Sequence, residues 1–214
     1  MHQPHHTLSK ARRIIKAIRR KPTIHLGLWW LGLAKAESQT SEAERECLAR
    51  HAEGKKCLAE IGVWHGMTTC RLRRAMAPEG VLVAVDPYRP GKFGFSAQQI
   101  IAHREVSRIR HGTVNWLRTT GGEAARQLPS TIHGTFDFVF VDGDHSYEGL
   151  REDWEGWTKL VAPGGIVALH DSRSSSARQI DDVGSVRFTR DVIVRDSRFR
   201  VIETVDSLTV VQRQ

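Results

Sequence analysis

Two apolar runs of this chain, residues 136–141 and 164–169, each end in titratable side chains. Those side chains are three carboxylates and two imidazoles: Asp142, Asp144, His145, His170 and Asp171. Both runs are short and rich in β-branched or aromatic residues, which is typical of buried parallel strands. In open α/β sheets the carboxyl ends of such strands form the edge where ligands bind. Packing does not require this density of charge, so we expect the working site there.

A glycine turn lies upstream of these runs. Residues 57–61 are predicted to form a strand, and Gly62 and Gly66 then allow a tight turn and a close backbone approach at the start of a helix. The spacing matches neither the G-x-G-x-x-G of dinucleotide binders nor the G-K-[ST] of phosphate-binding loops. A second strand, residues 81–85, ends in Asp86, about 20 residues after the turn, where an acid can accept hydrogen bonds from ribose hydroxyls. The alternative for Asp86 is a simple turn residue.

The remaining elements alternate between helix and strand. A capping box at Ser41 and Glu44 predicts a helix. A third strand over residues 114–118 precedes the turn Thr120-Gly121-Gly122-Glu123, whose polar groups either reach an adenine or only cap the next helix. Residues 199–205 and 208–211 predict an antiparallel hairpin that closes the sheet.

The helix that follows the central strand carries an apolar stripe. Its members recur at three- and four-residue spacing, which indicates core packing and argues against a cofactor cage: Tyr147, Leu150, Trp154, Trp157 and Val161. The turn 163–165 then leads into the strand that ends at His170. Residues 172–182 are predicted to form a mobile loop over the site. Residues 183–196 are predicted to be helical.

Composition is that of a globular protein of one domain with an appendage. The 214 residues are 40% hydrophobic and 26% charged. Three cysteines, an odd number without C-x-x-C spacing, predict neither a disulfide framework nor a zinc site and favour a reducing cytoplasm. No apolar run is long enough to span a membrane.

The net charge of +8 belongs to the N-terminus, because residues 1–36 hold eight of the 32 basic residues and none of the 24 acids. Residues 8–21 predict a basic amphipathic helix. It either contacts an anionic membrane surface, an acidic partner or nucleic acid, or packs on the protein with its charges in water. The apolar segment 24–33 needs cover, as a lid over the site or in a homodimer interface. The neutral remainder argues against a nucleic-acid surface on the domain.

The order of these motifs resembles that of class I S-adenosylmethionine-dependent methyltransferases. The resemblance rests on Glu60-x-Gly62-x-x-x-Gly66, Asp86 and Pro163-Gly164-Gly165, in α/β repeats that end in a hairpin, and covers residues 41–214, with 1–40 as the basic arm and lid. It implies a Rossmann-like, doubly wound α/β fold with a seven-stranded sheet in the order 3-2-1-4-5-7-6 and strand 7 antiparallel. It also implies a cofactor pocket built by Glu60, Gly62, Gly66, Asp86, Gly122 and Glu123.

The stretch Asp142-Gly143-Asp144-His145-Ser146-Tyr147 and the sequence His170-Asp171-Ser172 look like the metal-dependent O-methyltransferases of natural-product sugars, which have a metal site related to that of catechol-type enzymes. The resemblance implies that Asp142 and Asp171 hold Mg²⁺ and that His145 is the base. Ser172 stands where catechol-type enzymes have Asn, so that His170 or Asp144 is the candidate third ligand. The implied reaction is methylation of a hydroxyl on a small molecule or glycan.

Two other classes of function remain open. One is a metal-free methyltransferase that uses the same histidine, and the other is a methyltransferase-like scaffold whose basic arm binds an acidic partner. Nucleic-acid methylation is disfavoured because the chain lacks the Asn/Asp-Pro-Pro-Tyr/Phe sequence of amino-methylating enzymes. The sequence predicts a cytoplasmic protein, peripheral to the membrane only if the arm binds lipid. The acceptor should be selected by segments 22–36, 87–95 and 172–182.

Overall fold

The computed structural model of the protein describes residues 21–128, 135–176 and 178–214. The predicted basic helix at residues 8–21 therefore lies, except for Lys21, outside the described residues. Within the described part of the chain, no helix combines the length and the apolar character that crossing a bilayer demands.

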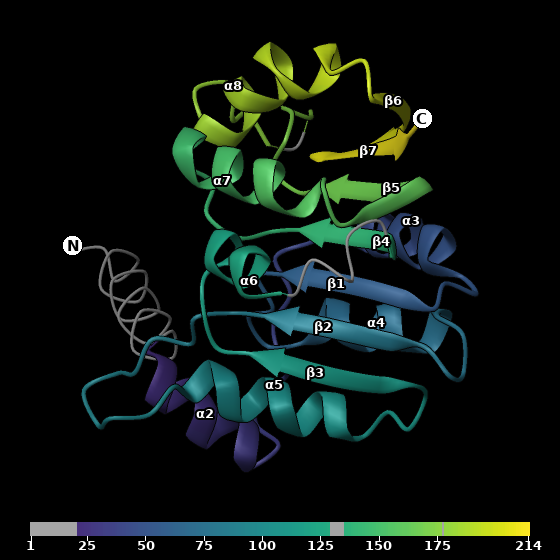
Figure 1. Ribbon diagram of the computed structural model, residues 1–214. Helices are drawn as coiled ribbons and strands as arrows, with labels where there is room; N and C mark the ends of the chain where they lie inside the picture. Colours follow the sequence, from purple (N-terminus) through teal and green to yellow (C-terminus); the bar gives the residue numbers. More distant parts are fainter. Residues whose placement is uncertain (1–20, 129–134, 177) are drawn as a thin grey trace, which may run out of the picture.

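A seven-stranded sheet forms the centre of the molecule (Figure 1). The strands are β1 (Cys57–Ile61), β2 (Val81–Val85), β3 (Thr113–Leu117), β4 (Phe136–Val141), β5 (Val161–Leu169), β6 (Phe199–Val205) and β7 (Leu208–Arg213). Their order is β3-β2-β1-β4-β5-β7-β6, and β7 is antiparallel to both β5 and β6 whereas the other pairs are parallel. The expected sheet order is confirmed, so the carboxyl ends of β1 to β5 meet at one edge.

Helices cover both faces of this sheet (Figure 1). They are α2 (Pro22–Trp30), α3 (Glu42–Ala52), α4 (Met67–Ala75), α5 (Ala97–Ser107), α6 (Gly121–Gln127), α7 (Tyr147–Trp157) and α8 (Gly184–Asp191). Successive residues of a strand point to opposite faces. Accordingly, Leu58 joins the core beneath α3, α4 and α5, whereas Ala59 joins the core beneath α6 and α7.

The helix starts follow the capping signals in the sequence. The Ser41 hydroxyl accepts a hydrogen bond from the Glu44 N–H, and the Glu44 carboxylate accepts one from the Ser41 N–H, which is the predicted capping box. The hydroxyl of Ser146 accepts from the Gly149 N–H and starts α7. In α7, Trp154 and Trp157 are buried in the core, as predicted.

Two boundaries differ from the sequence predictions. The turn predicted at residues 163–165 lies inside β5, where the register against β4 shifts between Phe136 and Phe138, so the chain is a bulged strand there. The single helix predicted over residues 183–196 is instead α8 followed by the 3₁₀ helix η2 (Ile193–Arg195), because Val192 leaves helical geometry at φ −122°.

Candidate active site

A cavity of about 630 Å³ opens at the carboxyl edge of the sheet. The loops after β1, β2, β3 and β4 line it, together with residues 37–39, which precede α3. Its size is in the range of small-molecule sites. Of the sequence-predicted residues, Gly62, Asp86, Gly122, Asp142 and His145 line this cavity.

Both predicted glycines are required, for different reasons. Gly62 has φ +87°, and a Cβ there would lie 1.9 Å from the carbonyl oxygen of Asp142. The β1 turn is therefore pressed against the β4 turn, which joins the two halves of the cavity floor. Gly66 has φ +75° at the start of α4, and its Cβ would lie 2.8 Å from Val106 of α5. Gly66 therefore allows the start of α4 to lie close to α5, and this contact is not part of the cavity.

Asp86 fixes two turns, which is one of the two roles that the sequence allowed, and it also lines the cavity. Its Oδ2 accepts hydrogen bonds of 3.0 Å from the N–H groups of Val63 and Trp64, and its Oδ1 accepts one of 2.8 Å from the Tyr88 N–H. The carboxylate thus fixes the β1 turn and its own turn while it lines the cavity. Each oxygen keeps a lone pair for a ligand hydroxyl.

Glu60, Gly66 and Glu123 do not line the cavity. Glu60 is fully buried in the sheet, and burial raises the pKa of its carboxyl well above the ordinary value. Glu123 lies in the first turn of α6, where its backbone N–H is capped by Thr120 and its carboxylate accepts a hydrogen bond from the Thr119 hydroxyl. The Glu123 geometry matches the helix-cap interpretation.

Asp153 of α7 lines the same cavity and was missed by the sequence analysis. A Cβ atom on Gly121 would lie 2.2 Å from the Asp153 carboxylate, so that turn needs glycine. A Cβ atom on Gly143 would lie 3.1 Å from the same carboxylate, which is a tight contact. Burial, and then the negative charges of Asp144 and Glu152, raise the pKa of Asp153 to about 7. The only sign of Asp153 in the sequence was an acidic residue beside the tryptophans of the predicted apolar stripe.

The ends of β4 and β5 bring the predicted catalytic residues together. The Nε2 atom of His145 lies 3.7 Å from Oδ1 of Asp142 and 3.7 Å from Oδ2 of Asp171. His145 is about one third exposed, whereas the Asp171 side chain is 3% exposed. One imidazole thus faces two carboxylates from neighbouring strands. Asp142 and His145 line the cavity, whereas Asp171 and His170 do not.

His170 lies behind this group. Its Nδ1 is 2.8 Å from Oδ1 of Asp142, and its Nε2 is 3.4 Å from Oε2 of Glu44 on α3. Burial disfavours the charged ring, but the hydrogen bond to Asp142 and the ion pair with Glu44 outweigh it and raise the pKa of His170 to about 10. Burial likewise opposes ionisation of Glu44, but the ion pair with His170 and hydrogen bonds from Ser207 and Ser41 lower its pKa to about 2. This pairing favours His170 as a hydrogen-bond donor to Asp142 over a metal ligand.

Asp171 is held in an unusual state. Its φ of +47° lies in the left-handed region, which non-glycine residues rarely adopt. The carboxylate is buried, and its Oδ1 finds no hydrogen-bond partner within the described residues. Its Oδ2 forms an ion pair of 2.7 Å with Arg178, in the loop after β5.

The residues at this position fit a divalent cation. Asp142 and Asp171 offer carboxylate oxygens, the ligands that Mg²⁺ prefers. The buried Oδ1 atom of Asp171 accepts no hydrogen bond among the described residues and lies 3.7 Å from Nδ1 of His170. Asp142, His145 and His170 carry ligand atoms within 4.8 Å of one another. Asp144, the other candidate ligand, lines the cavity, and its Oδ1 accepts a hydrogen bond from the Ser146 N–H.

The segment before α3 closes one side of the cavity. Glu37 donates its N–H to Nδ1 of His65 at 3.0 Å, and the His65 ring stacks on His25 of α2 with centroids 5.0 Å apart. Burial lowers the pKa of His65 to about 4, so the ring is neutral and can accept that bond. Trp29 packs on α5 through a hydrogen bond to Glu105, while Trp30 stays exposed.

Comparison with known proteins agrees with this architecture. Residues 59–172, more than half of the chain, match the family described as methyltransferase domain. The chain is 32% identical over 126 residues to a catechol O-methyltransferase of Mycobacterium tuberculosis, an alignment that covers 58% of this chain and 51% of the relative. The chain therefore aligns with about half of the length of that relative.

Two solved structures share the fold. An O-methyltransferase of Streptomyces achromogenes involved in tomaymycin synthesis, in complex with S-adenosylmethionine, matches with a TM-score of 0.62 at 19% identity over 87% of this chain and 86% of the other. An O-methyltransferase of Bacillus cereus, in complex with S-adenosylhomocysteine, matches with a TM-score of 0.59 at 19% identity over 86% of each chain. The chain belongs to the family described as methyltransferase domain, and its sheet has the strand order expected for class I S-adenosylmethionine-dependent methyltransferases.

Proposed function

We propose that the protein transfers the methyl group of S-adenosylmethionine to a hydroxyl of a small molecule or glycan, with a divalent ion at Asp142 and Asp171 and with His145 as the base. The observation that carries the proposal is the placement of the His145 Nε2 atom, 3.7 Å from both carboxylates, in a side chain that lines the cavity. The O-methyltransferase relatives support the choice of oxygen as the acceptor atom.

The cofactor is proposed to occupy the side of the cavity lined by Gly62, Asp86 and Gly122. Gly62 keeps the β1 turn close to the ligand, and the free lone pairs of Asp86 can accept hydrogen bonds from ribose hydroxyls. Asp153, which lies beside Gly121 at the wall, is a further polar group that the cofactor can meet.

The chain's own groups would then carry the transfer. Bound S-adenosylmethionine supplies an electrophilic methyl group, and a bound divalent ion lowers the pKa of the acceptor hydroxyl. His145 would take the hydroxyl proton at Nε2, which faces Asp142 and Asp171. These two carboxylates would stabilise the imidazolium that forms and hold the ion. Residues 37–39 would exclude water from one side of the cavity.

The cofactor test is a calorimetric titration with S-adenosylhomocysteine. Asp86→Ala should abolish binding. Asp137→Ala is a matched control, because Asp137 also accepts two backbone N–H groups, from Lys56 and Cys57, but at the start of β1. Binding that survives Asp86→Ala, or no binding to the wild type, would overturn the cofactor assignment. The second result would favour the scaffold interpretation.

The base test is the rate of methyl transfer from labelled cofactor to a panel of sugar and phenolic hydroxyls. His145→Ala should lower the rate by about 10²- to 10⁴-fold, the range for loss of a general base. Cofactor binding should be unchanged. His111→Ala is the control. It also removes an imidazole, but one that hydrogen bonds to the Met76 carbonyl. An unchanged rate in His145→Ala would remove this residue from the mechanism.

One observation favours a metal-free reaction as the second candidate. The Arg178 guanidinium lies 2.7 Å from Asp171 and already balances its charge. In that reaction His145 would act alone as the base. Methyl transfer that persists after exhaustive chelation would support this alternative, and activity restored only by added Mg²⁺ would support the metal-dependent one.

A further inference from the structure

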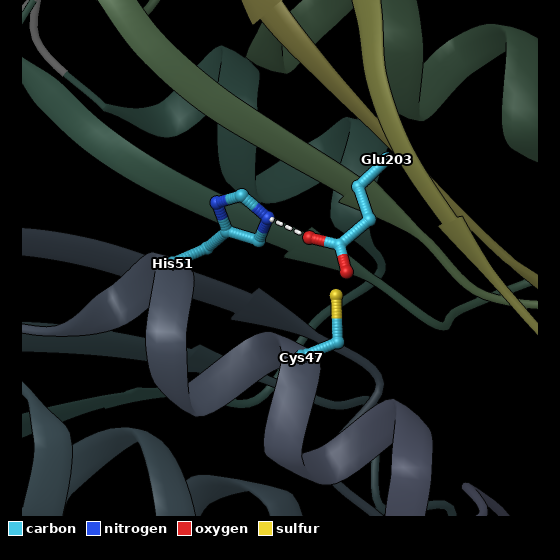
Figure 2. Close-up of side chains that lie close together, drawn as sticks. All are labelled: Cys47, His51 and Glu203. Carbon is cyan, nitrogen blue, oxygen red and sulfur yellow. Dashed lines mark hydrogen bonds and ion pairs between the residues drawn. The ribbon is translucent and has the colours of Figure 1, made fainter.

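A second group of metal-ligating side chains lies away from the cavity, between α3 and β6. Cys47 and His51 are one helical turn apart on α3 and project toward Glu203 of β6 (Figure 2). Positions i and i+4 share one face of a helix, so both side chains can reach the same point. One ligand atom from each of the three residues lies within 4.8 Å of the other two.

The contacts in this group already resemble a ligand set. His51 Nε2 lies 2.8 Å from Oε2 of Glu203, and the Cys47 sulfur faces the same carboxylate (Figure 2). Cys47 is completely buried, whereas the side chains of His51 and Glu203 are 21% and 32% exposed. The thiol therefore forms the inner wall, and solvent can reach the group through the other two side chains.

We propose that Cys47, His51 and Glu203 bind a thiophilic divalent ion, for which Zn²⁺ is the best match. Thiolate, imidazole and carboxylate are the three ligand types of zinc sites, and three protein ligands leave the fourth tetrahedral position for water. Mg²⁺ would not select a thiolate, so this site differs in metal preference from the carboxylate pair at the cavity. The inference does not depend on the proposed function.

Arg50 completes the surroundings of the ligands. Its Nη2 lies 2.6 Å from Oε1 of Glu203, so one carboxylate oxygen is held by a charged donor while the other faces His51. Ligating carboxylates in metal sites are commonly held in this way by outer hydrogen bonds. The Arg50 side chain is 58% exposed, so its charge is largely screened by water.

Binding must release a proton. Burial, and then the charge of Glu203, raise the pKa of the Cys47 thiol to about 11, so the thiol is protonated in the free protein. The ion forms a bond to sulfur as the S–H bond breaks, and the proton leaves to solvent. His51 would bind the ion through Nε2, so that nitrogen must carry no proton when the ion binds. The apparent affinity should therefore rise with pH.

The ion would fix α3 to the edge of the sheet. The same helix carries Glu44, whose carboxylate accepts hydrogen bonds from the Ser207 N–H and hydroxyl and lies 3.4 Å from His170. A metal between α3 and β6 thus acts on the element that holds His170 behind the candidate active site.

The test uses Co²⁺ as a spectroscopic probe for Zn²⁺, added to the full chain with its thiols reduced. A tetrahedral site with one thiolate gives a sulfur-to-cobalt charge-transfer band and intense visible bands, and stoichiometric Zn²⁺ should abolish both. Oxygen ligands at Asp142 and Asp171, or the histidines among residues 1–7, give no thiolate band. The signal is therefore specific for cysteine.

Variants then identify the ligands. Cys47→Ser should abolish the band, and the surface changes His51→Gln and Glu203→Gln should each weaken Co²⁺ binding by at least tenfold. Cys57→Ser and Cys70→Ser are the matched controls and should keep the band. The proposal is overturned if the wild type gives no thiolate band, if Cys47→Ser retains it, or if both surface variants bind as tightly as the wild type.

Discussion

The Nδ1 atom of His170 lies 2.8 Å from the Oδ1 atom of Asp142. His170 directly follows β5, and Asp142 directly follows the neighbouring parallel strand β4. The opposite ring nitrogen faces Glu44 on α3, so the imidazole links a helix to the candidate metal ligand. Residues that hydrogen bond to a metal ligand orient it and thereby change the affinity of the site for its metal. The relationship gives His170 a testable role that differs from direct ligation.

His170→Gln should weaken activation by Mg²⁺ by about 10- to 100-fold, because Asp142 loses the charged imidazolium donor that orients it. Glu44→Gln should act in the same direction, since the charge that holds the imidazolium is removed. The measurement is methyl transfer as a function of Mg²⁺ concentration, together with cofactor affinity, which should not change. An identical Mg²⁺ dependence in both variants would contradict the positioning role.

Arg178→Met separates the two candidate mechanisms. If a divalent ion binds Asp171, the guanidinium competes with it, and its removal should lower the Mg²⁺ concentration needed for half-maximal activity. If the reaction is metal-free, the buried charge of Asp171 loses its guanidinium partner, and activity should fall. Arg173→Met, in the same loop but with no ion pair to Asp171 among the described residues, controls for loss of surface charge. Rates measured with Mg²⁺ and with chelator distinguish the outcomes.

Gly62→Ala should destabilise the protein strongly and weaken cofactor binding. The added Cβ both strains the left-handed backbone and meets the Asp142 carbonyl oxygen at 1.9 Å. Gly54→Ala isolates the first effect, because Gly54 has φ +68° and no atom within 4 Å of its Cβ. Denaturant unfolding should show a loss of about 1 to 2 kcal/mol for Gly54→Ala and a clearly larger one for Gly62→Ala. Equal losses would show that the two turns are not pressed together.

Asp153 should make stability depend on pH. Its folded pKa of about 7 lies above the ordinary value of 3.8, so between these values the folded state binds more protons than the unfolded state. The free energy of unfolding should therefore decrease as the pH rises from 4 to 7. Asp153→Asn cannot ionise and should flatten this segment of the profile. A wild-type decrease that persists unchanged in Asp153→Asn would assign it to other groups.

Local patterns in the sequence determined the strands, the capping box, the glycine turn and the grouping of Asp142, His145 and Asp171. A strand's apolar period fixes where it ends, and parallel strands place their carboxyl ends at one edge. Glycine-rich spacing and family resemblance also selected Glu60 and Glu123, yet neither side chain lines the cavity, because strand direction and helix capping turn them elsewhere.

Only the tertiary structure revealed the partners that come from distant elements. Glu44 meets His170 from α3, and Asp153 reaches the cavity from α7. Arg178 pairs with Asp171 inside the loop after β5, a contact that sequence spacing does not specify. Residue spacing also argued against a zinc site, whereas Glu203 lies 152 positions after His51 and contacts it at 2.8 Å. Periodicity reports which face a residue occupies. It does not report which residue of another element packs against that face, and that contact decides hydrogen bonding, charge and ligand geometry.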